Sequence, residues 1–167
     1  MHEVILEELG LMPLWQLRTT SAVMADTAPL VSIESVAGAE LLAITVQRGD
    51  GVPGRVLMDK VMSADAATLF ANMLQAMHLR QLDSAQLDYA QLSDSVNRGD
   101  VQWLWLMGDA LVQRMLDTDS AMVELSQQAV CWQSLPVFVS QHPDVLLLHN
   151  QEKSAVWAGW CSWLQQR

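Results

Sequence analysis

Histidine and acidic side chains gather in the stretch PVFVSQHPDVLLLHN, residues 136–150. His142 and Pro143 directly follow a predicted buried strand, and Asp144 and His149 come shortly after. An imidazole can act as a general base, hydrogen-bond a ligand or coordinate a metal. The two histidines lack the i, i+4 spacing of a helical metal-binding pair, so no metal site is predicted. At the carboxyl end of a strand, however, His142 would lie where open α/β sheets bind their ligands. We expect instead that it is a structural residue at the strand end, which hydrogen-bonds the backbone of its own turn.

Few other residues have the type and spacing of catalytic or metal-binding residues. Cys131 and Cys161 cannot by themselves form a tetrathiolate zinc site or a four-thiolate iron–sulfur cluster. They could pair, but two scattered thiols favour a reducing compartment. The loop sequence QRGDGVPGR contains a lone carboxylate, Asp50. No GxSxG, Walker-type or GxGxxG motif is present. We therefore predict no catalytic residue and no cofactor.

The composition restricts the class of partner. The chain has 167 residues, of which 19 are acidic and 9 basic, and its formal charge is −10. Affinity for duplex DNA comes mostly from Lys and Arg neutralising phosphates, so direct duplex binding is not expected. The N-terminus lacks the basic region of a signal peptide. Apolar runs such as Leu41–Val46 are much shorter than the ~20 residues that span a bilayer. These features predict a cytoplasmic protein without membrane contact.

The pattern of apolar and turn residues predicts strands that alternate with helices. Helices are expected over 3–11, 63–77 and 84–97, and a further helix begins after Gly108. Ser63 is the expected N-cap of the second helix, and Asn150 is the expected N-cap of the last one. Strands are expected over 40–46, 101–107 and 135–141, with a weaker strand or turn at 130–132 and a loop at 48–55. This alternation is typical of a three-layer α/β/α fold with a short, mostly parallel central sheet.

Tryptophan is abundant, with seven residues, and most of them are clustered. Trp103 and Trp105 share one face of the predicted strand because side chains alternate along a strand. In the last helix Val156, Trp160 and Trp163 recur at helical spacing, flanked by Trp157 and Leu164. Such rings either fill the core or form an aromatic surface for a protein partner.

The stretch PVFVSQHPDVLLLHNQEKSAVWAGWCSWL, 136–164, resembles the C-terminal motif of the uracil-DNA glycosylase superfamily. The upstream segments QWLWLMGDALVQRML and LFANMLQAMHL resemble other parts of that family, so the resemblance covers residues 60–164 in order. It implies that His142 corresponds to the histidine that hydrogen-bonds the flipped uracil. The loop after residues 44–46, where the family carries its water-activating carboxylate or Asn, contains only Asp50 and no aromatic side chain.

The N-terminal stretch LEELGLMPLWQLR, 6–18, resembles the signature of the psi subunit of bacterial DNA polymerase III. That subunit is a degenerate, non-catalytic member of the glycosylase-like fold. Its N-terminal segment docks on the clamp loader and its body binds the chi subunit. The resemblance implies a docking segment at 1–18, a connection at 19–35 and a glycosylase-like α/β domain at 36–167. The residues that match the docking segment are Leu9, Gly10, Trp15, Leu17 and Arg18.

Together the two resemblances predict a non-enzymatic adaptor that bridges the clamp loader and a chi-like subunit. His142 and Pro143 would then be the remnant of a base-binding pocket. The alternative is a divergent uracil-DNA glycosylase that acts in base excision repair. A short helix at residues 3–11 is marginal alone and needs a surface to cover its apolar side chains. That surface is either a partner's groove or the protein's own domain.

Overall fold

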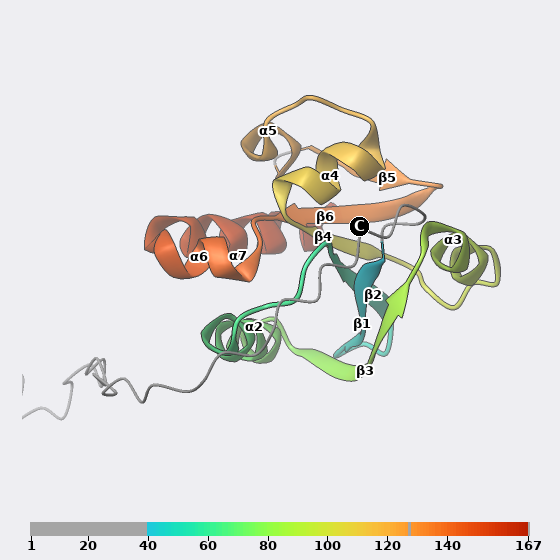
Figure 1. Cartoon of the computed structure of the whole chain (residues 1–167), viewed down its shortest axis with the longest axis horizontal. Helices are drawn as coiled ribbons and strands as arrows, with labels where there is room; N and C mark the ends of the chain where they lie inside the picture. Colours follow the sequence, from blue (N-terminus) through green and yellow to red (C-terminus); the bar gives the residue numbers. More distant parts are fainter. Residues whose placement is uncertain (1–39, 127, 167) are drawn as a thin grey trace, which may run out of the picture. The chain divides into compact units, whose positions relative to one another are not determined.

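The computed structural model describes residues 40–126 and 128–166 (Figure 1). The predicted docking segment at 1–18, with its five matching residues, and the connection at 19–35 lie outside this range. The strands described are β1 (Leu41–Arg48), β2 (Pro53–Met58), β3 (Leu79–Leu87), β4 (Leu104–Met107), β5 (Val130–Trp132) and β6 (Leu135–Ser140). The helices are α2 (Ala64–Ala76), α3 (Tyr89–Asn97), α4 (Asp109–Leu116), α5 (Met122–Ser126), α6 (Pro143–Leu148) and α7 (Asn150–Gln165).

The strands form one mixed sheet in the order β3-β1-β2-β4-β6-β5. β2, β4 and β6 run parallel, whereas β1 is antiparallel to both β2 and β3, and β5 is antiparallel to β6. The prediction of a mostly parallel sheet is therefore wrong, because most of the strand pairs are antiparallel. The reason is local, because the connections after β1 and β5 are tight turns, and a parallel pair needs a crossover of a dozen residues or more.

Two segments differ from the sequence prediction and account for this error. Residues 53–58 form β2, although the prediction placed residues 53–55 in a loop and no strand there. Residues 79–87 form β3, although the prediction placed the start of a helix at 84. The turn between β1 and β2 contains Gly51, whose φ of 86° is favourable for glycine. Asp50 accepts hydrogen bonds from the Arg48 guanidinium and from the Val52 amide. β1 and β2 thus form a hairpin.

Helices cover both faces of the sheet (Figure 1). α2, α6 and α7 contribute Phe70, Leu146 and Trp160 to one buried cluster. α3, α4 and α5 contribute Leu92, Leu111 and Leu125 to a second cluster on the opposite face. The α/β class of the prediction is confirmed, and the helices form a layer on each side of the sheet.

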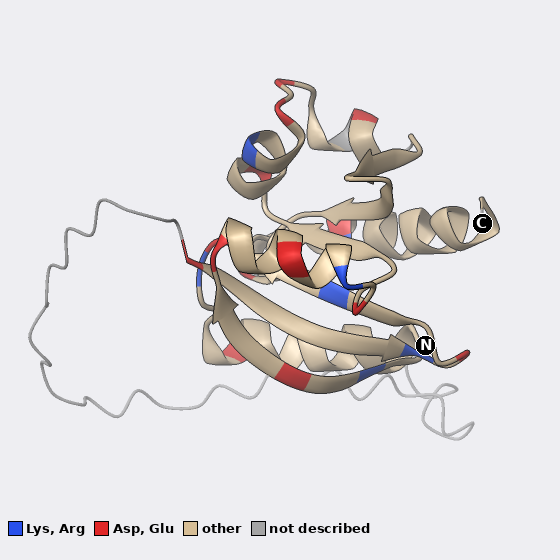
Figure 2. Ribbon diagram, turned by 90° about the vertical axis from the view of Figure 1, so that its right-hand side faces the viewer, with Lys and Arg blue, Asp and Glu red and all other residues tan. Residues whose placement is uncertain are grey.

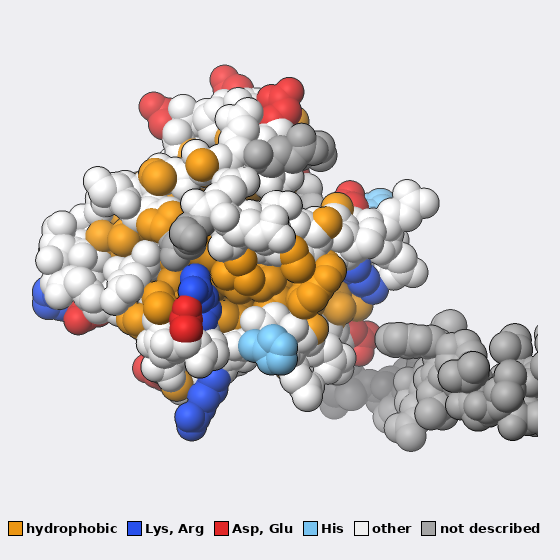
Figure 3. All heavy atoms as spheres, turned by 180° about the vertical axis from the view of Figure 1, so that it is seen from behind, with side chains coloured by type: hydrophobic (Ala, Val, Ile, Leu, Met, Phe, Trp, Pro, Cys, Tyr) orange, Lys and Arg blue, Asp and Glu red, His pale blue; other side chains and the backbone are white. Residues whose placement is uncertain are grey.

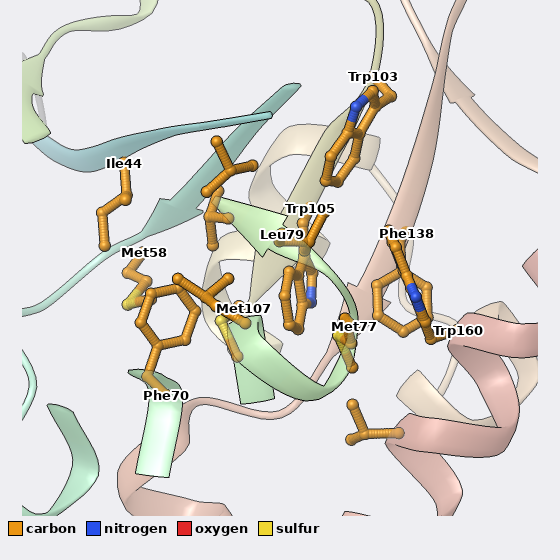
Figure 4. Close-up of a cluster of buried hydrophobic side chains, with 14 of the residues drawn as sticks. Ile44, Met58, Phe70, Met77, Leu79, Trp103, Trp105, Met107, Phe138 and Trp160 are labelled. Atoms are coloured by element: carbon orange, nitrogen blue, oxygen red, sulfur yellow. The ribbon is translucent and has the colours of Figure 1, made fainter. Parts of the chain in front are cut away.

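The first cluster is built around stacked and tilted aromatic rings. Trp103 and Trp105 both belong to it, which confirms that they share a face (Figure 4). Trp160 of α7 lies with its ring centroid 5.5 Å from that of Trp103 and 5.1 Å from that of Trp163. Phe138 of β6 completes the group. These tryptophans are core residues, whereas Trp157 of α7 is 45% exposed.

The helix ends follow the capping chemistry of the sequence. Ser63 caps α2 as predicted, since its side chain accepts from the Ala66 amide at 3.3 Å. The last helix begins one residue earlier than predicted, because His149 is the N-cap and Asn150 is the first helical residue. The Asn150 side chain instead accepts a hydrogen bond of 2.7 Å from the Lys153 ammonium.

The turn between β5 and β6 offers a direct test of backbone strain. Gln133 and Ser134 are its two central residues, with φ of 47° and 68°. Positive φ at both positions is the pattern of a type I′ turn, which favours glycine at the second position. We expect Ser134→Gly to raise the free energy of unfolding by about 0.5–1 kcal/mol in urea denaturation. An unchanged or lower value would show that the turn is not strained.

Candidate functional site

The carboxyl ends of β2, β4 and β6 meet at one edge of the sheet. Asp59 and Gly108 directly follow β2 and β4, and His142 comes two residues after the end of β6. Gly108 lies between the other two. A Cβ added to Gly108 would be 3.6 Å from Asp59 Oδ1 and 3.8 Å from His142 Cβ. The Gly108 amide donates to Ser140 O at 2.9 Å, which fixes the start of α4 against β6. His142 therefore lies at the strand end predicted for it.

The His142 imidazole is 2% exposed and both of its nitrogens have partners. Nδ1 accepts from the Asp144 amide at 3.3 Å and thereby caps α6, with Pro143 as the first residue of that helix. Nε2 lies 3.3 Å from Lys60 O. In the neutral form with its proton on Nε2, the ring accepts at one nitrogen and donates at the other. This confirms the prediction that His142 hydrogen-bonds the backbone of its own turn.

Asp144 connects the same turn to α2. Its Oδ1 accepts from the Ser63 hydroxyl and from the Ser63 amide, and its Oδ2 lies 3.2 Å from His142 Nδ1. The hydrogen bond from the Ser63 side chain is the main reason that the pKa of Asp144 lies below its ordinary value. Since Ser63 also caps α2, one carboxylate joins the N-termini of α2 and α6.

This carboxylate should make stability depend on pH. A depressed pKa in the folded state contributes stability above the ordinary aspartate pKa, about 3.9, and that contribution is lost as pH falls through the folded value. We expect Asp144→Asn to lower the free energy of unfolding by about 1 kcal/mol at pH 7, with a difference from wild type that narrows below about pH 4. Urea denaturation from pH 3 to 7 measures it. A constant difference over that range would contradict the assignment.

The remaining polar groups of this edge largely bond to one another. Ser140 Oγ accepts from Trp105 Nε1 at 2.8 Å, and Gln141 Nε2 donates to Asp109 Oδ1 at 3.2 Å. Asp59 is exposed. The edge thus holds the exposed carboxylate of Asp59 near the His142 imidazole, and both nitrogens of that ring already contact backbone atoms.

Sequence reasoning missed Asp59 because it did not recognise β2. Asp50, the lone carboxylate of the predicted loop, lies in the β1–β2 turn and pairs with Arg48. That interaction is also the main reason that the pKa of Asp50 is lowered. The short apolar run Val56–Met58, followed directly by an acid, was the available signal. It resembles a buried strand that ends in a polar residue.

Metal-ligating side chains do not gather within residues 40–126 and 128–166, where no group of three His, Cys, Asp or Glu could hold an ion. Cys131 is exposed and Cys161 is partly buried, and both are free thiols. In the same part of the chain no helix is both long and apolar enough to cross a bilayer.

A second feature is an apolar groove between α2 and α7, with a volume of about 210 Å³. It is lined by Leu69 and Met73 of α2, by the C-cap residue Met77, and by Val156 and Trp157 of α7. Lys153 also lines it. On the face seen in Figure 3, apolar side chains form a broad continuous area bordered by a few charged ones. Exposed apolar patches of this kind often contact protein partners, and methionines adapt well to such contacts.

Comparisons with known proteins give no further assignment: no protein-family model, no curated protein and no solved structure matches the chain.

Proposed function

We propose that this protein is a non-catalytic accessory subunit of the DNA polymerase III holoenzyme, similar to the psi subunit, that bridges the clamp loader and a chi-like subunit. The observation that carries the proposal is the state of His142. In the glycosylases that the sequence resembles, this histidine binds the extruded base, but here its ring is buried and both nitrogens hold backbone segments together. Such a residue serves the fold.

The N-terminal resemblance supplies the other half of the proposal. In this proposal residues 1–18 dock on the clamp loader, with Trp15 as an anchor of the kind that dominates helix-in-groove interfaces. In the same proposal residues 36–167 are a glycosylase-like α/β domain that retains the fold but has no catalytic activity. In Figure 2 the Lys and Arg residues are interspersed with Asp and Glu, and the net charge of the chain is −10. This charge distribution favours basic protein surfaces over nucleic acid, in keeping with a cytoplasmic replication factor.

An adaptor needs a second contact surface, and the groove between α2 and α7 is suited to that role. Its walls are apolar and Trp157 is exposed at 45%. In this proposal the groove region faces the chi-like subunit while the N-terminal segment holds the clamp loader. The adaptor then acts by raising the effective concentration of one partner near the other.

The bridging role is tested by mixing a reconstituted bacterial clamp loader and a chi subunit with and without this protein. Size-exclusion chromatography with light scattering should show a complex of all three only when the protein is present. A clamp loader and chi subunit that elute separately in its presence would contradict the proposal.

A divergent uracil-DNA glycosylase is the second candidate, and Asp59 is the observation that favours it. This exposed carboxylate and His142 flank Gly108 at the end of the parallel strands. Incubation with single-stranded DNA that contains uracil distinguishes the two functions. Uracil release that disappears in both Asp59→Asn and His142→Ala would establish the enzyme, whereas the adaptor proposal expects no release by any of the three proteins.

A further inference from the structure

The two helices that border the groove between α2 and α7 carry few charges. Asp65 is the charged residue of α2, and Glu152 and Lys153 are those of α7, and all three lie near the start of their helix. From Ala66 to the end of α2, and from Ser154 to the end of α7, every residue is uncharged. Surface helices normally carry charges on their exposed side, whereas the centres of protein interfaces are depleted in them. The composition of both helices therefore fits a surface that another protein covers.

Lys153 is the charged residue among those that line the groove. Its ammonium donates to Asn150 Oδ1, a neutral acceptor, at 2.7 Å, and within the described residues no Asp or Glu forms an ion pair with it. An ammonium carries three N–H donors, so this single hydrogen bond leaves capacity for a carboxylate. A positive charge near the start of a helix also opposes the helix dipole. A carboxylate brought by a partner would offset both effects.

The charge and the exposed aromatic ring of the groove have helical spacing. Lys153 and Trp157 both line the groove, and residues four apart in a helix are neighbours on one side of it. They are separated by about 6 Å along the axis of α7. Leu69 and Met73 have the same spacing on α2. The groove thus presents a positive group about one helical turn from an apolar surface.

The walls of the groove also select the conformation of a partner. Both walls are α-helices, whose backbone groups form hydrogen bonds within the helix. An extended segment would find no backbone groups on either wall to pair with, and buried N–H and C=O groups without partners cost free energy. A helix pairs its own backbone groups and presents side chains three and four residues apart on one face. A helix is therefore the conformation that fits.

We propose that the groove binds one amphipathic helix of the chi-like subunit. In this arrangement an apolar side chain of that helix packs against Met73 and Trp157, and a carboxylate three or four residues away pairs with Lys153. Cavities of roughly 150 Å³ hold benzene, so the groove volume of about 210 Å³ is sufficient for a large apolar side chain. The inference rests on the proposed adaptor function and specifies the element by which the second partner binds.

The test is isothermal titration calorimetry of the full chain with a bacterial chi subunit. Wild type should bind, and Trp157→Ala and Lys153→Gln should each bind at least about tenfold more weakly, because aromatic anchors and close charge pairs dominate such interfaces. Leu82→Ala and Lys60→Gln are the matched controls. They change an exposed apolar residue and an exposed lysine that do not line the groove, and both should bind like wild type.

The same titrations separate failure of this inference from failure of the adaptor role. A wild-type chain that binds chi, with unchanged affinity in Trp157→Ala and Lys153→Gln, would overturn the inference and leave the adaptor role in place. A wild-type chain that does not bind chi would contradict the adaptor role and the inference together. Light scattering of the chain alone tests a second copy as the occupant. A dimer that Trp157→Ala converts to a monomer would overturn the inference.

Hydrogen exchange of the chi subunit, in complex with wild type and with Trp157→Ala, identifies the element that binds the groove. We expect the protection that depends on Trp157 to be confined to one helix. The sequence of that helix should place an acidic residue three or four positions from an apolar one. Protection of a strand or a loop instead would contradict the proposal.

Discussion

Replacing Gly54 with alanine is expected to destabilise the fold by about 3 kcal/mol or more. A Cβ at this position in β2 would lie 2.0 Å from Trp103 Cε2 and 2.4 Å from Trp103 Nε1, far inside van der Waals contact. Trp103 is fully buried and is held by the rings of Trp160 and Trp163, each at 5.5 Å between centroids. The indole has no room to retreat, so the added methyl forces overpacking. Urea denaturation monitored by circular dichroism measures the loss.

Gly159→Ala is the matched control for this prediction. Its added Cβ would lie 3.5 Å from Phe138 Cε2, which is an ordinary contact, and its position inside α7 favours alanine over glycine. We expect the control to be neutral or to stabilise the fold by up to about 1 kcal/mol. Similar stabilities for Gly54→Ala and Gly159→Ala would contradict the close approach of β2 to Trp103.

Trp160→Ala is expected to cost about 3–5 kcal/mol in the free energy of unfolding. Trp160 is 2% exposed and its ring packs against four others, so truncation removes a large apolar side chain and leaves a cavity. For a domain with a total stability of about 5–15 kcal/mol, this loss is a large fraction. Chemical denaturation of the purified variant measures it.

Trp157→Ala provides the comparison on the same helix. Trp157 is 45% exposed and lines the groove between α2 and α7, so its truncation should change stability by less than about 1 kcal/mol. The difference between the two tryptophans depends on which face of α7 contacts the sheet. Equal costs for both variants would show that the orientation of α7 is wrong.

The features that the sequence predicts correctly are those with strong periodicity or a clear cap. The stripe of Val156, Trp160 and Trp163 follows the helical period and is buried as expected. Ser63 caps α2, because serine before a run of helix-forming residues has few competing roles. His142 lies at a strand end because the apolar residues 135–139 before it indicate a buried strand. In each case local chemistry and tertiary packing agree.

The features that the sequence does not predict lack such agreement. β2 begins with Pro53 and Gly54, which indicate a loop when read alone, and only the approach of Trp103 explains why glycine is required there. β3 is an edge strand whose residues 80–86 are all exposed, so it shows no alternation of apolar and polar side chains. Because both errors affect the strands next to β1, the antiparallel half of the sheet was missed. Asp59 was missed with it.

Binding of the full chain to a reconstituted bacterial clamp loader, measured by biolayer interferometry for wild type and Trp15→Ala, tests the adaptor role most directly. The account predicts that wild type binds and that Trp15→Ala binds at least about tenfold more weakly, because a tryptophan anchor contributes about 2 kcal/mol or more. Trp157→Ala, a tryptophan substitution in α7, should bind like wild type. A clamp loader that does not bind the wild-type protein, or that binds Trp15→Ala equally well, would contradict the account.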